Sequence, residues 1–193
     1  MLIKKSFYFV RHGETDHNRQ GLCAGGKVDT SLNETGKKQA LLLRETILLR
    51  QKLQNLSFSQ VVSSPMKRAM ETARLALNVE PHIEHDLREW ELGELEEQPV
   101  AQFLDYIAQL PRETPLLGGE SFAFFCQRVA TAMNRVLGGS ESPLIVAHGG
   151  VHWALLKMLD LPTRRIENTE LVYFRYEQGG WRVERDEPAT SVG

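Results

Sequence analysis

The chain has 193 residues, of which 41% are hydrophobic and 25% charged, as is ordinary for a globular protein able to bury a core without disulfides or metals. Its 23 Lys and Arg residues nearly balance 25 Asp and Glu residues, and the formal net charge is −2. This balance excludes a global basic field that would attract nucleic acid or an anionic membrane, so any anion must be recognised locally.

Neither the cysteines nor the apolar runs indicate export or a membrane. Cys23 and Cys126 lie far apart and in no metal or redox spacing, so we expect two idle thiols. The run from Phe7 to Val10 is too short for a signal peptide, and no stretch approaches the length of a membrane span. We therefore expect a cytoplasmic protein that binds no nucleic acid and no membrane.

The first half of the sequence alternates short apolar runs with amphipathic segments. Residues 6–10 are typical of a strand that is covered on both faces. A glycine-rich loop follows, and Asn33 then caps a predicted helix. The apolar face of that helix includes Ala40, Leu43, Ile47 and Leu48. Residues 58–62 predict a second strand.

The next helix is predicted to begin with Ser64 as its N-cap and Pro65 in its first turn. One face of this helix carries Met66, Ala69, Met70, Ala73 and Leu77. The middle of the chain is less regular, with a short helical pattern at residues 100–110. From Ser121 a longer helix is predicted, with an apolar stripe of Phe122, Phe125, Val129, Met133 and Val136.

The last part of the sequence predicts a buried strand at 144–147, a helix at about 151–159 and a hairpin of strands 171–176 and 181–185. The residues after Glu187 are predicted to form a polar tail. Short apolar strands that alternate with helices indicate an α/β fold, a three-layer sandwich with a mostly parallel central sheet and helices on both faces. We expect one domain over residues 1–193. A homodimer, paired through a helix or the hairpin, is left open beside a monomer.

Ligands of such sheets bind beyond the carboxyl ends of the strands, and three predicted strands end in suggestive residues. Arg11, His12 and Gly13 follow the first strand. The second strand is followed by Ser63-Ser64-Pro65, which puts Arg68 in the first turn of the next helix. The strand at 144–147 is followed by His148, Gly149 and Gly150. If the strands are parallel, two histidines and two arginines converge at one edge.

This set of residues suits phosphoryl transfer. Arginine offers a planar fork to two phosphoryl oxygens, and helix N-termini add backbone donors. Glycines beside both histidines would let the backbone approach an anion closely. A neutral imidazole can attack phosphorus, and the arginines would stabilise the transferring charge, so we predict no metal and no cofactor.

These motifs resemble those of the histidine phosphatase superfamily, in its phosphoglycerate mutase-like branch. The resemblance runs from Phe7 to about Tyr176 through five ordered motifs. They are Arg11-His12-Gly13-Glu14-Thr15 with Asn18, Ser63-Ser64-Pro65 through Ala73, Leu87-Arg88-Glu89 with Leu92-Gly93, Gly119-Glu120-Ser121, and Ala147-His148-Gly149-Gly150.

The resemblance implies a role for each matching residue. His12 would be phosphorylated, and Glu89 would protonate the leaving oxygen and later activate water. Arg11, Arg68 and His148 would bind the phosphoryl group, while Asn18 and Gly149 would contact the phosphate or the substrate. A cap-like insertion of about residues 91–120 would cover the carboxyl ends of the strands. A carboxyl near Trp90 could also have the raised pKa that a general acid needs.

Two segments depart from the family pattern, namely a loop at 23–29 that is one residue longer and Trp90 in place of a smaller or acidic residue. We expect neither to touch the core of the site. Residues 91–118 carry one basic residue, Arg112, against six acidic ones, which disfavours a substrate with a second anionic group, although Lys27 could add one cation. Aromatic side chains near the same entrance could stack on a leaving group or belong to the core: Trp90, Phe103, Tyr106, Phe122 and Phe125.

The short cap and the stretch from Gly21 to Gly25 resemble the α-ribazole 5′-phosphate phosphatases of cobalamin biosynthesis, so the implied substrate is that small phosphate monoester. A broad-specificity phosphatase, a phosphoglycerate mutase-type enzyme and an inactive module that binds phosphorylated ligands remain alternatives. Residues 21–27 spell the start of a P-loop, but Val28 stands where Ser or Thr is required. The pairs His148/His152 and His82/His85 have metal-site spacing, which leaves a zinc hydrolase as a further alternative.

Overall fold

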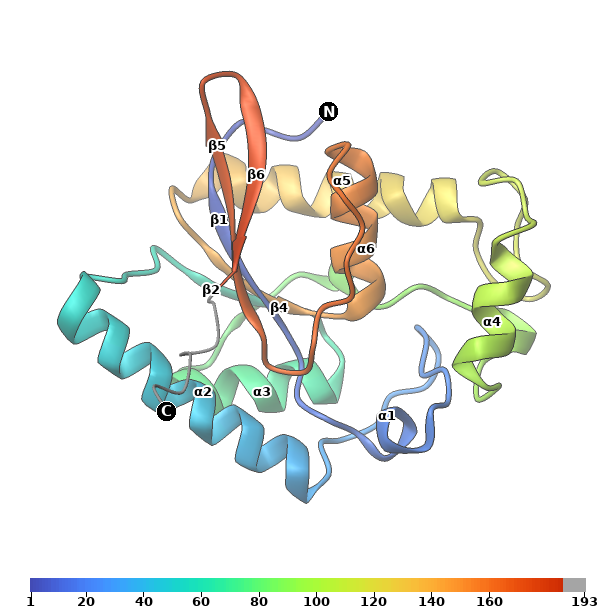
Figure 1. Ribbon diagram of the computed structural model, residues 1–193, viewed down its shortest axis with the longest axis horizontal. Helices are drawn as coiled ribbons and strands as arrows, with labels where there is room; N and C mark the ends of the chain where they lie inside the picture. The colour runs from blue at the N-terminus through green and yellow to red at the C-terminus, as the bar shows by residue number, and fades with distance from the viewer. Residues whose placement is uncertain (186–193) are drawn as a thin grey trace, which may run out of the picture.

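The computed structural model describes residues 1–185, which fold around one six-stranded sheet of order β3-β2-β4-β1-β5-β6 (Figure 1). The strands are β1 (Phe7–Arg11), β2 (Val61–Ser63), β3 (His82–Ile83), β4 (Leu144–Ala147), β5 (Leu171–Glu177) and β6 (Gly180–Arg185). The first four strands run parallel, whereas β5 and β6 pair antiparallel at one edge. The predicted mostly parallel sheet and its closing hairpin are confirmed.

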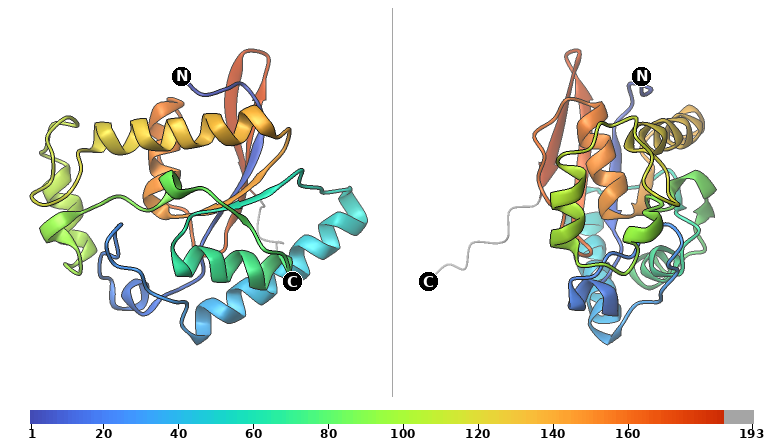
Figure 2. Two further views of the ribbon diagram at one scale, coloured as in Figure 1. Left: turned by 180° about the vertical axis from the view of Figure 1, so that it is seen from behind. Right: turned by 90° about the vertical axis from the view of Figure 1, so that its right-hand side faces the viewer.

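Helices cover both faces of the sheet, which makes the three predicted layers. The α-helices are α1 (Asp16–Gln20), α2 (Glu34–Gln54), α3 (Lys67–Leu77), α4 (Val100–Ile107), α5 (Phe122–Gly139) and α6 (Gly149–Met158), with short 3₁₀ helices η1 (His85–Leu87) and η2 (Gly93–Leu95). Figures 1 and 2 show α5 and α6 on one side of the strands and α2 and α3 on the other. Helix α4 lies outside these layers.

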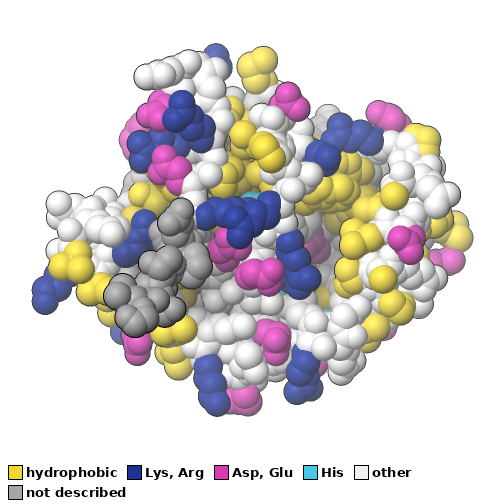
Figure 3. Space-filling view, viewed as in Figure 1, with side chains coloured by type: hydrophobic (Ala, Val, Ile, Leu, Met, Phe, Trp, Pro, Cys, Tyr) yellow, Lys and Arg dark blue, Asp and Glu magenta, His cyan; other side chains and the backbone are white. Residues whose placement is uncertain are grey.

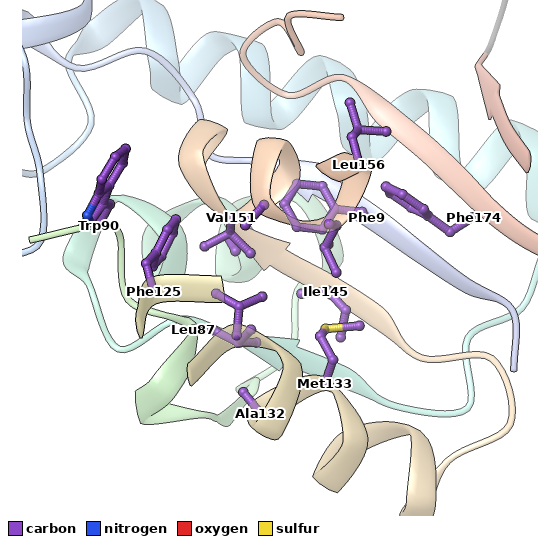
Figure 4. Close-up of a cluster of buried hydrophobic side chains, with 14 of the residues drawn as sticks. Phe9, Leu87, Trp90, Phe125, Ala132, Met133, Ile145, Val151, Leu156 and Phe174 are labelled. Atoms are coloured by element: carbon purple, nitrogen blue, oxygen red, sulfur yellow. The ribbon is translucent and has the colours of Figure 1, made fainter. Parts of the chain in front are cut away.

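The central strands β1 and β4 are apolar up to Arg11 because alternate side chains enter two different cores. Phe9 and Ile145 point toward α5 and α6, where they pack with Phe125 and Met133 in the larger cluster (Figure 4). Leu144 and Val146, the neighbours of Ile145 in β4, pack instead against α2 and α3. Both faces of these two strands are thus buried. The polar side chains that can contact a ligand therefore lie at the ends of the strands.

Some element boundaries differ from the prediction. The second strand covers Val61–Ser63 instead of 58–62, because Phe58 packs its ring against Tyr8 from outside the strand. Helix α6 begins at Gly149, two residues early. The prediction that Leu48 faces the core is wrong, since that side chain is 54% exposed while Leu43 and Ile47 are buried.

Capping was predicted correctly at α2 and wrongly at α3. Asn33 accepts a hydrogen bond from Gly36 as the predicted N-cap of α2, and Ser121, where a helix was predicted to begin, accepts one from Phe124 as the N-cap of α5. Ser64 is not the N-cap of α3, because the N-cap position is occupied by Met66 and the helix begins at Lys67. The hydroxyl of Ser64 is instead hydrogen-bonded to His148. The short elements α1 and β3 were not predicted, since five and two residues carry too little periodicity.

Several expectations concern features outside the layers. Cys23 and Cys126 are both free, and burial raises the pKa of each thiol to about 11, which agrees with idle thiols. Within residues 1–185, no helix is long and apolar enough to cross a membrane. The predicted polar tail lies outside the described residues, and the single domain with its cap-like insertion stays a prediction.

Gly13 of the first loop and Gly36 of α2 lie in close contact, so we expect Gly36 to tolerate no larger side chain. A methyl group at Gly36 would lie 2.1 Å from the carbonyl oxygen of Glu14, and one at Gly13 would lie 2.6 Å from that of Gly36. We expect Gly36→Ala to lower the free energy of unfolding by about 2 kcal/mol or more, as overpacking does. Gly139→Ala is the matched control, because a methyl group there meets no atom within 4 Å. Equal stability of the two variants in urea denaturation would contradict this packing.

Candidate functional site

The parallel pairing of β1 with β4 brings the two predicted histidines together. Arg11 pairs with Ala147 as the last residue of β1, so it ends the strand instead of following it as predicted. The next backbone amide, that of His12, donates to the carbonyl oxygen of Ala147 at 2.9 Å. The two chains therefore leave the sheet side by side, and the rings of His12 and His148 lie 5.3 Å apart between centroids.

His12 is held in one tautomer with one free nitrogen. Its Nδ1 lies 2.7 Å from the carbonyl oxygen of Gly13, which can only accept, so Nδ1 carries the proton. The other nitrogen, Nε2, then keeps its lone pair. Burial and the charges of Arg68 and Arg11 hold the pKa of His12 well below its usual value, so the ring is neutral near pH 7. This imidazole has the state that a nucleophile requires.

The two arginines of the site are fixed by carbonyl oxygens. Arg68 is fully buried, and its Nη atoms donate to the carbonyl oxygens of Val28, Ala24 and Gly25 at 2.7, 3.0 and 3.3 Å. Arg11 donates from Nη1 to the carbonyl oxygen of Ile166 at 2.8 Å. Because carbonyls orient the guanidinium groups without neutralising them, both positive charges stay available to an anion.

His148 is also oriented by a partner on one side. Its Nε2 lies 2.7 Å from the hydroxyl of Ser64, which in turn accepts the amide of Met66 at 3.3 Å. The hydroxyl therefore donates to Nε2, and Nδ1 of the neutral ring carries the proton. Burial and the charge of Arg68 hold the pKa of His148 well below its ordinary value. Ser64 is thus part of the site, although the sequence suggested only a helix cap.

Three buried donor nitrogens of this cluster have no hydrogen-bond partner within the described chain: Nε of Arg11, Nε of Arg68 and Nδ1 of His148. A buried N–H without a partner costs free energy, and three in one place call for a ligand that accepts hydrogen bonds. Two of the groups are cationic, so the favoured ligand is an anion with several oxygens. These donors gather around the ring of His12, which lies 5.3 Å from that of His148 between centroids, so the cluster suits an oxyanion.

Glu89 comes from the segment after η1, and its carboxylate reaches this cluster from the side of α6. The amides of Trp90 and Gly150 donate to its two oxygens at 2.9 and 3.0 Å. Burial raises the pKa of this carboxyl above its usual range, although the two amides and the nearby arginines oppose the shift. The predicted acid therefore lies at the site with the predicted direction of pKa.

A buried ion pair fixes the backbone that carries Glu89. Arg128 of α5 pairs with Glu120, and both side chains are almost fully buried. The same guanidinium donates to the carbonyl oxygens of Asp86, Arg88 and Glu89 at 2.7, 3.0 and 3.2 Å. The sequence analysis quoted Glu120 only as part of a motif and missed Arg128. An arginine beside the apolar stripe of a helix was the signal that could have found it.

Asn18 is linked to His12 through Asn168, and its own side chain is engaged by other groups. Its Oδ1 accepts the amide of Thr15 at 3.2 Å and Nδ2 of Asn168 at 3.3 Å. Asn168 also donates to the carbonyl oxygen of His12 at 2.8 Å, so it ties the loop before β5 to the nucleophile. The next residue, Thr169, has a left-handed φ of 58°, and its amide donates to the carbonyl oxygen of Arg11 at 2.9 Å. Sequence reasoning missed this loop.

Two expectations about the surroundings were wrong. We expected the loop at 23–29 and Trp90 not to touch the core of the site, but this loop supplies the three carbonyls that hold Arg68, and the amide of Trp90 binds Glu89. The glycines after His148 were expected to let the backbone approach an anion, but they mainly allow close contacts within the chain. A methyl group at Gly150 would lie 2.2 Å from the Glu89 carboxylate, whereas one at Gly149 would stand 3.6 Å from Nε of Arg11.

The acidic cover is partly neutralised by its own contacts. Glu91 pairs with Arg88, Glu97 with His17, and Glu96 accepts the amides of Gly25, Lys27 and Leu92. Lys27 does not point a free ammonium into the site, because its Nζ donates to the carbonyl oxygen of Gly118 at 2.6 Å. The count of charges therefore overstates the repulsion of a second anion at Glu91, whereas Lys27 adds no free cation to attract one.

The predicted aromatic residues divide between core and cavity. Phe125 is core, Tyr106 is exposed, and Phe103 packs edge-on to Trp90. Trp90 and Phe122 are mostly buried, yet they also line a cavity of about 300 Å³ together with Trp153. Figure 3 shows hydrophobic side chains around a hollow to the right of centre. Among residues 1–185, no group of three or more His, Cys, Asp or Glu side chains could hold a metal ion.

The chain resembles proteins whose family and names agree with this geometry. A family model described as histidine phosphatase superfamily (branch 1) matches residues 7–187. An adenosylcobalamin/alpha-ribazole phosphatase from Salmonella typhimurium is 32% identical over 90% of this chain and 87% of its own. A crystal structure of the alpha-ribazole phosphatase from Shigella flexneri superposes with a TM-score of 0.73 and 26% identity, over 93% of this chain and 95% of that one.

Another relative is much longer. An agropine synthesis reductase from Rhizobium rhizogenes is 32% identical over 93% of this chain but only 41% of its own length. The chain thus spans about two fifths of that curated relative.

Buried histidines predict how stability depends on pH. Burial lowers the folded-state pKa of His12 and His148 well below 6.5 and that of His152 to about 3. Below about pH 6.5 the unfolded chain therefore binds more protons, so the free energy of unfolding falls as the pH falls. The raised pKa of Glu89 acts in the opposite direction, because that carboxyl binds its proton more tightly in the folded chain.

His152→Leu tests this outside the phosphate site, since that ring packs between Phe9 and Phe174. We expect the pH slope of the unfolding free energy between pH 6 and pH 4 to be shallower in the variant, by up to about 1.4 kcal/mol per unit. Urea denaturation at several pH values measures the slope. Parallel curves for the variant and the wild type would contradict the lowered pKa.

Proposed function

Because the chain belongs to the histidine phosphatase superfamily, we propose that it is a phosphomonoesterase that works through a phosphohistidine on His12. The reaction would hydrolyse a small phosphate monoester to its alcohol and inorganic phosphate. In this proposal, Arg11, Arg68 and His148 bind the phosphoryl group, Glu89 is the general acid and base, and no metal or cofactor takes part. Asn18 and the N-terminus of α6 at Gly149 flank the substrate.

The unpartnered donors carry this proposal. Nε of Arg11, Nε of Arg68 and Nδ1 of His148 are buried N–H groups beside the free lone pair of His12. A phosphoryl group has enough acceptor oxygens for all three, and the two guanidinium charges suit its negative charge. The same donors would stabilise the charge that spreads over the transferring group in the transition state.

The first half-reaction would phosphorylate the enzyme. Nε2 of His12 attacks phosphorus and forms a P–N bond while the ester P–O bond breaks. Glu89 gives its proton to the departing oxygen and becomes a carboxylate. The bound phosphate supports the protonated starting form of Glu89, because a nearby negative charge raises the pKa of a carboxyl further.

The second half-reaction would hydrolyse the phosphohistidine. The Glu89 carboxylate accepts a proton from water, whose oxygen forms a new P–O bond as the P–N bond breaks. His12 recovers its neutral ring with the proton on Nδ1, and Glu89 is again protonated for the next turnover. Two amides and the ion pair of Arg128 with Glu120 keep the acid in place through both steps.

For the substrate, we propose α-ribazole 5′-phosphate, a sugar phosphate that carries an aromatic base. Two relatives bear the name of an α-ribazole phosphatase and are aligned over about nine tenths of this chain. The aromatic walls of the 300 Å³ cavity, formed in part by Trp90 next to Glu89 in the chain, offer a ring-binding surface. A broad-specificity phosphatase and a phosphoglycerate mutase-type enzyme are the alternatives within the same mechanism, and an inactive phospholigand-binding module is the alternative outside it.

A substrate panel tests the proposal directly. Phosphate release from α-ribazole 5′-phosphate, 3-phosphoglycerate, fructose 2,6-bisphosphate and p-nitrophenyl phosphate would be measured with chelator present, for the wild type and His12→Ala. We expect activity in the wild type alone, with kcat/KM for α-ribazole 5′-phosphate leading the panel by about 100-fold or more, since a substrate that fills the cavity gains binding energy. Equal rates across the esters would show that the enzyme is a broad-specificity phosphatase instead of one specific for α-ribazole 5′-phosphate. Full activity of His12→Ala, or none with chelator, would refute the mechanism.

The role of Glu89 predicts a dependence on the leaving group. Glu89→Gln keeps the shape but cannot release a proton, so we expect kcat/KM for an alkyl phosphate to fall about 10²- to 10⁴-fold. The loss should be much smaller for p-nitrophenyl phosphate, because its phenolate leaves readily without protonation. Steady-state assays of both esters measure the difference, and an equal loss for both would show that Glu89 does not protonate the leaving group.

A further inference from the structure

A cavity of about 300 Å³ is built from the two segments that hold Glu89, although Glu89 itself does not line it. Its inner wall is Trp90, whose amide donates to one oxygen of the Glu89 carboxylate. Its other wall is Trp153 of α6, which lies one helical turn beyond Gly150, the donor to the second oxygen. The cavity therefore lies about one helical turn along α6 from the amide that holds Glu89, and the indole rings of Trp90 and Trp153 form two of its walls.

The walls of this cavity are aromatic and packed on one another. Phe122 lies 4.4 Å from Trp153 and 5.1 Å from Trp90, and the two tryptophans are 6.0 Å apart between ring centroids. Rings held in this way keep their positions, so the cavity is preformed and ordering it costs a ligand little. Such a surface recognises flat apolar groups by stacking and by excluding water.

The size of the cavity limits what it can hold. Its volume of about 300 Å³ is at the small end of ligand pockets, which suits one fused ring system. From Gly150 to Lys157, which lines its outer end, α6 rises about 10 Å at 1.5 Å per residue. A ring that reached the middle of the cavity would thus need a short spacer, such as one sugar, between it and the ester.

Arg112 covers the cavity from the cap. Its guanidinium carbon lies 5.1 Å from the centroid of the Phe122 ring, in cation–π contact, and its side chain is exposed toward solvent. A planar guanidinium over an aromatic wall can also stack on a ring that enters beside it. Figure 3 shows Lys and Arg side chains at the upper edge of the hollow.

From this geometry we propose that the cavity is a leaving-group subsite that selects a planar aromatic ring, with Trp153 and Arg112 as its specificity-determining residues. The inference rests on the proposed phosphatase function and adds to it the residues that set the substrate class. It also explains how an enzyme with an acidic cap could prefer a ring-bearing ester, since stacking and water exclusion need no charge on the substrate.

A ratio of two substrates isolates this subsite. α-Ribazole 5′-phosphate and ribose 5-phosphate share the sugar phosphate and differ in the ring. The ratio of their kcat/KM values does not depend on the fraction of enzyme that is correctly folded. In the wild type we expect kcat/KM for α-ribazole 5′-phosphate to exceed that for ribose 5-phosphate at least about 10-fold, because this is the gain in affinity that stacking on one aromatic ring provides. Trp153→Leu should lower this ratio about 10-fold, and Arg112→Ala about threefold.

Trp181→Leu is the matched control, because this tryptophan is also half-buried but packs against Phe7 and Tyr176 in the hairpin. Its ratio should equal that of the wild type. A wild-type ratio near one, or an unchanged ratio in Trp153→Leu, would overturn the subsite. If neither ester is hydrolysed, the proposed function fails and calorimetric binding of α-ribazole itself decides: binding that Trp153→Leu weakens supports the subsite, and no binding overturns it.

Discussion

Arg68 is fully buried, and within the described chain its hydrogen bonds go to three backbone carbonyl oxygens and to no carboxylate. A buried charge with no carboxylate in contact is costly, and the three carbonyls and the more distant carboxylates of Glu89, Asp29 and Glu96 offset part of that cost. The rest of the site follows from this constraint. Burial, together with the charges of Arg68 and Arg11, holds the pKa of His12 and His148 well below its usual value and keeps both rings neutral. The unpartnered donors mark where an anion would find hydrogen bonds.

The loops at the carboxyl ends of the strands are arranged to hold this charge and the groups beside it. The loop at 23–29 turns its carbonyls inward to Arg68, and the loop before β5 binds the backbone of Arg11 and His12. On the opposite side, Arg128 and Glu120 fix the segment that carries Glu89. Glu89 and His12, the proposed acid and nucleophile, are thus held by different elements, so each is positioned before any substrate binds, as preorganisation requires.

The sequence was sufficient for five of the six strands and for the residues at the carboxyl ends of β1, β2 and β4. Apolar runs marked these strands, and the rule for parallel sheets predicted that His12, Arg68 and His148 lie together. Glu89 needed the family resemblance, because a glutamate in a charged segment is ordinarily solvated. The positioning contacts of Ser64, Arg128 and Asn168 could not be predicted, since each joins segments far apart in the chain. The apolar face of α2 was misjudged at Leu48, which is one residue beyond the buried Ile47.

The central claim is that a phosphoryl group passes from the substrate to Nε2 of His12. Rapid quenching of the enzyme during turnover, followed by mass spectrometry of its peptides under alkaline conditions that preserve phosphohistidine, tests that claim most directly. The account predicts one phosphoryl group on the peptide that contains His12, which forms and decays at rates compatible with kcat. A turnover in which no phosphopeptide forms, or in which the label is on another residue, would contradict it.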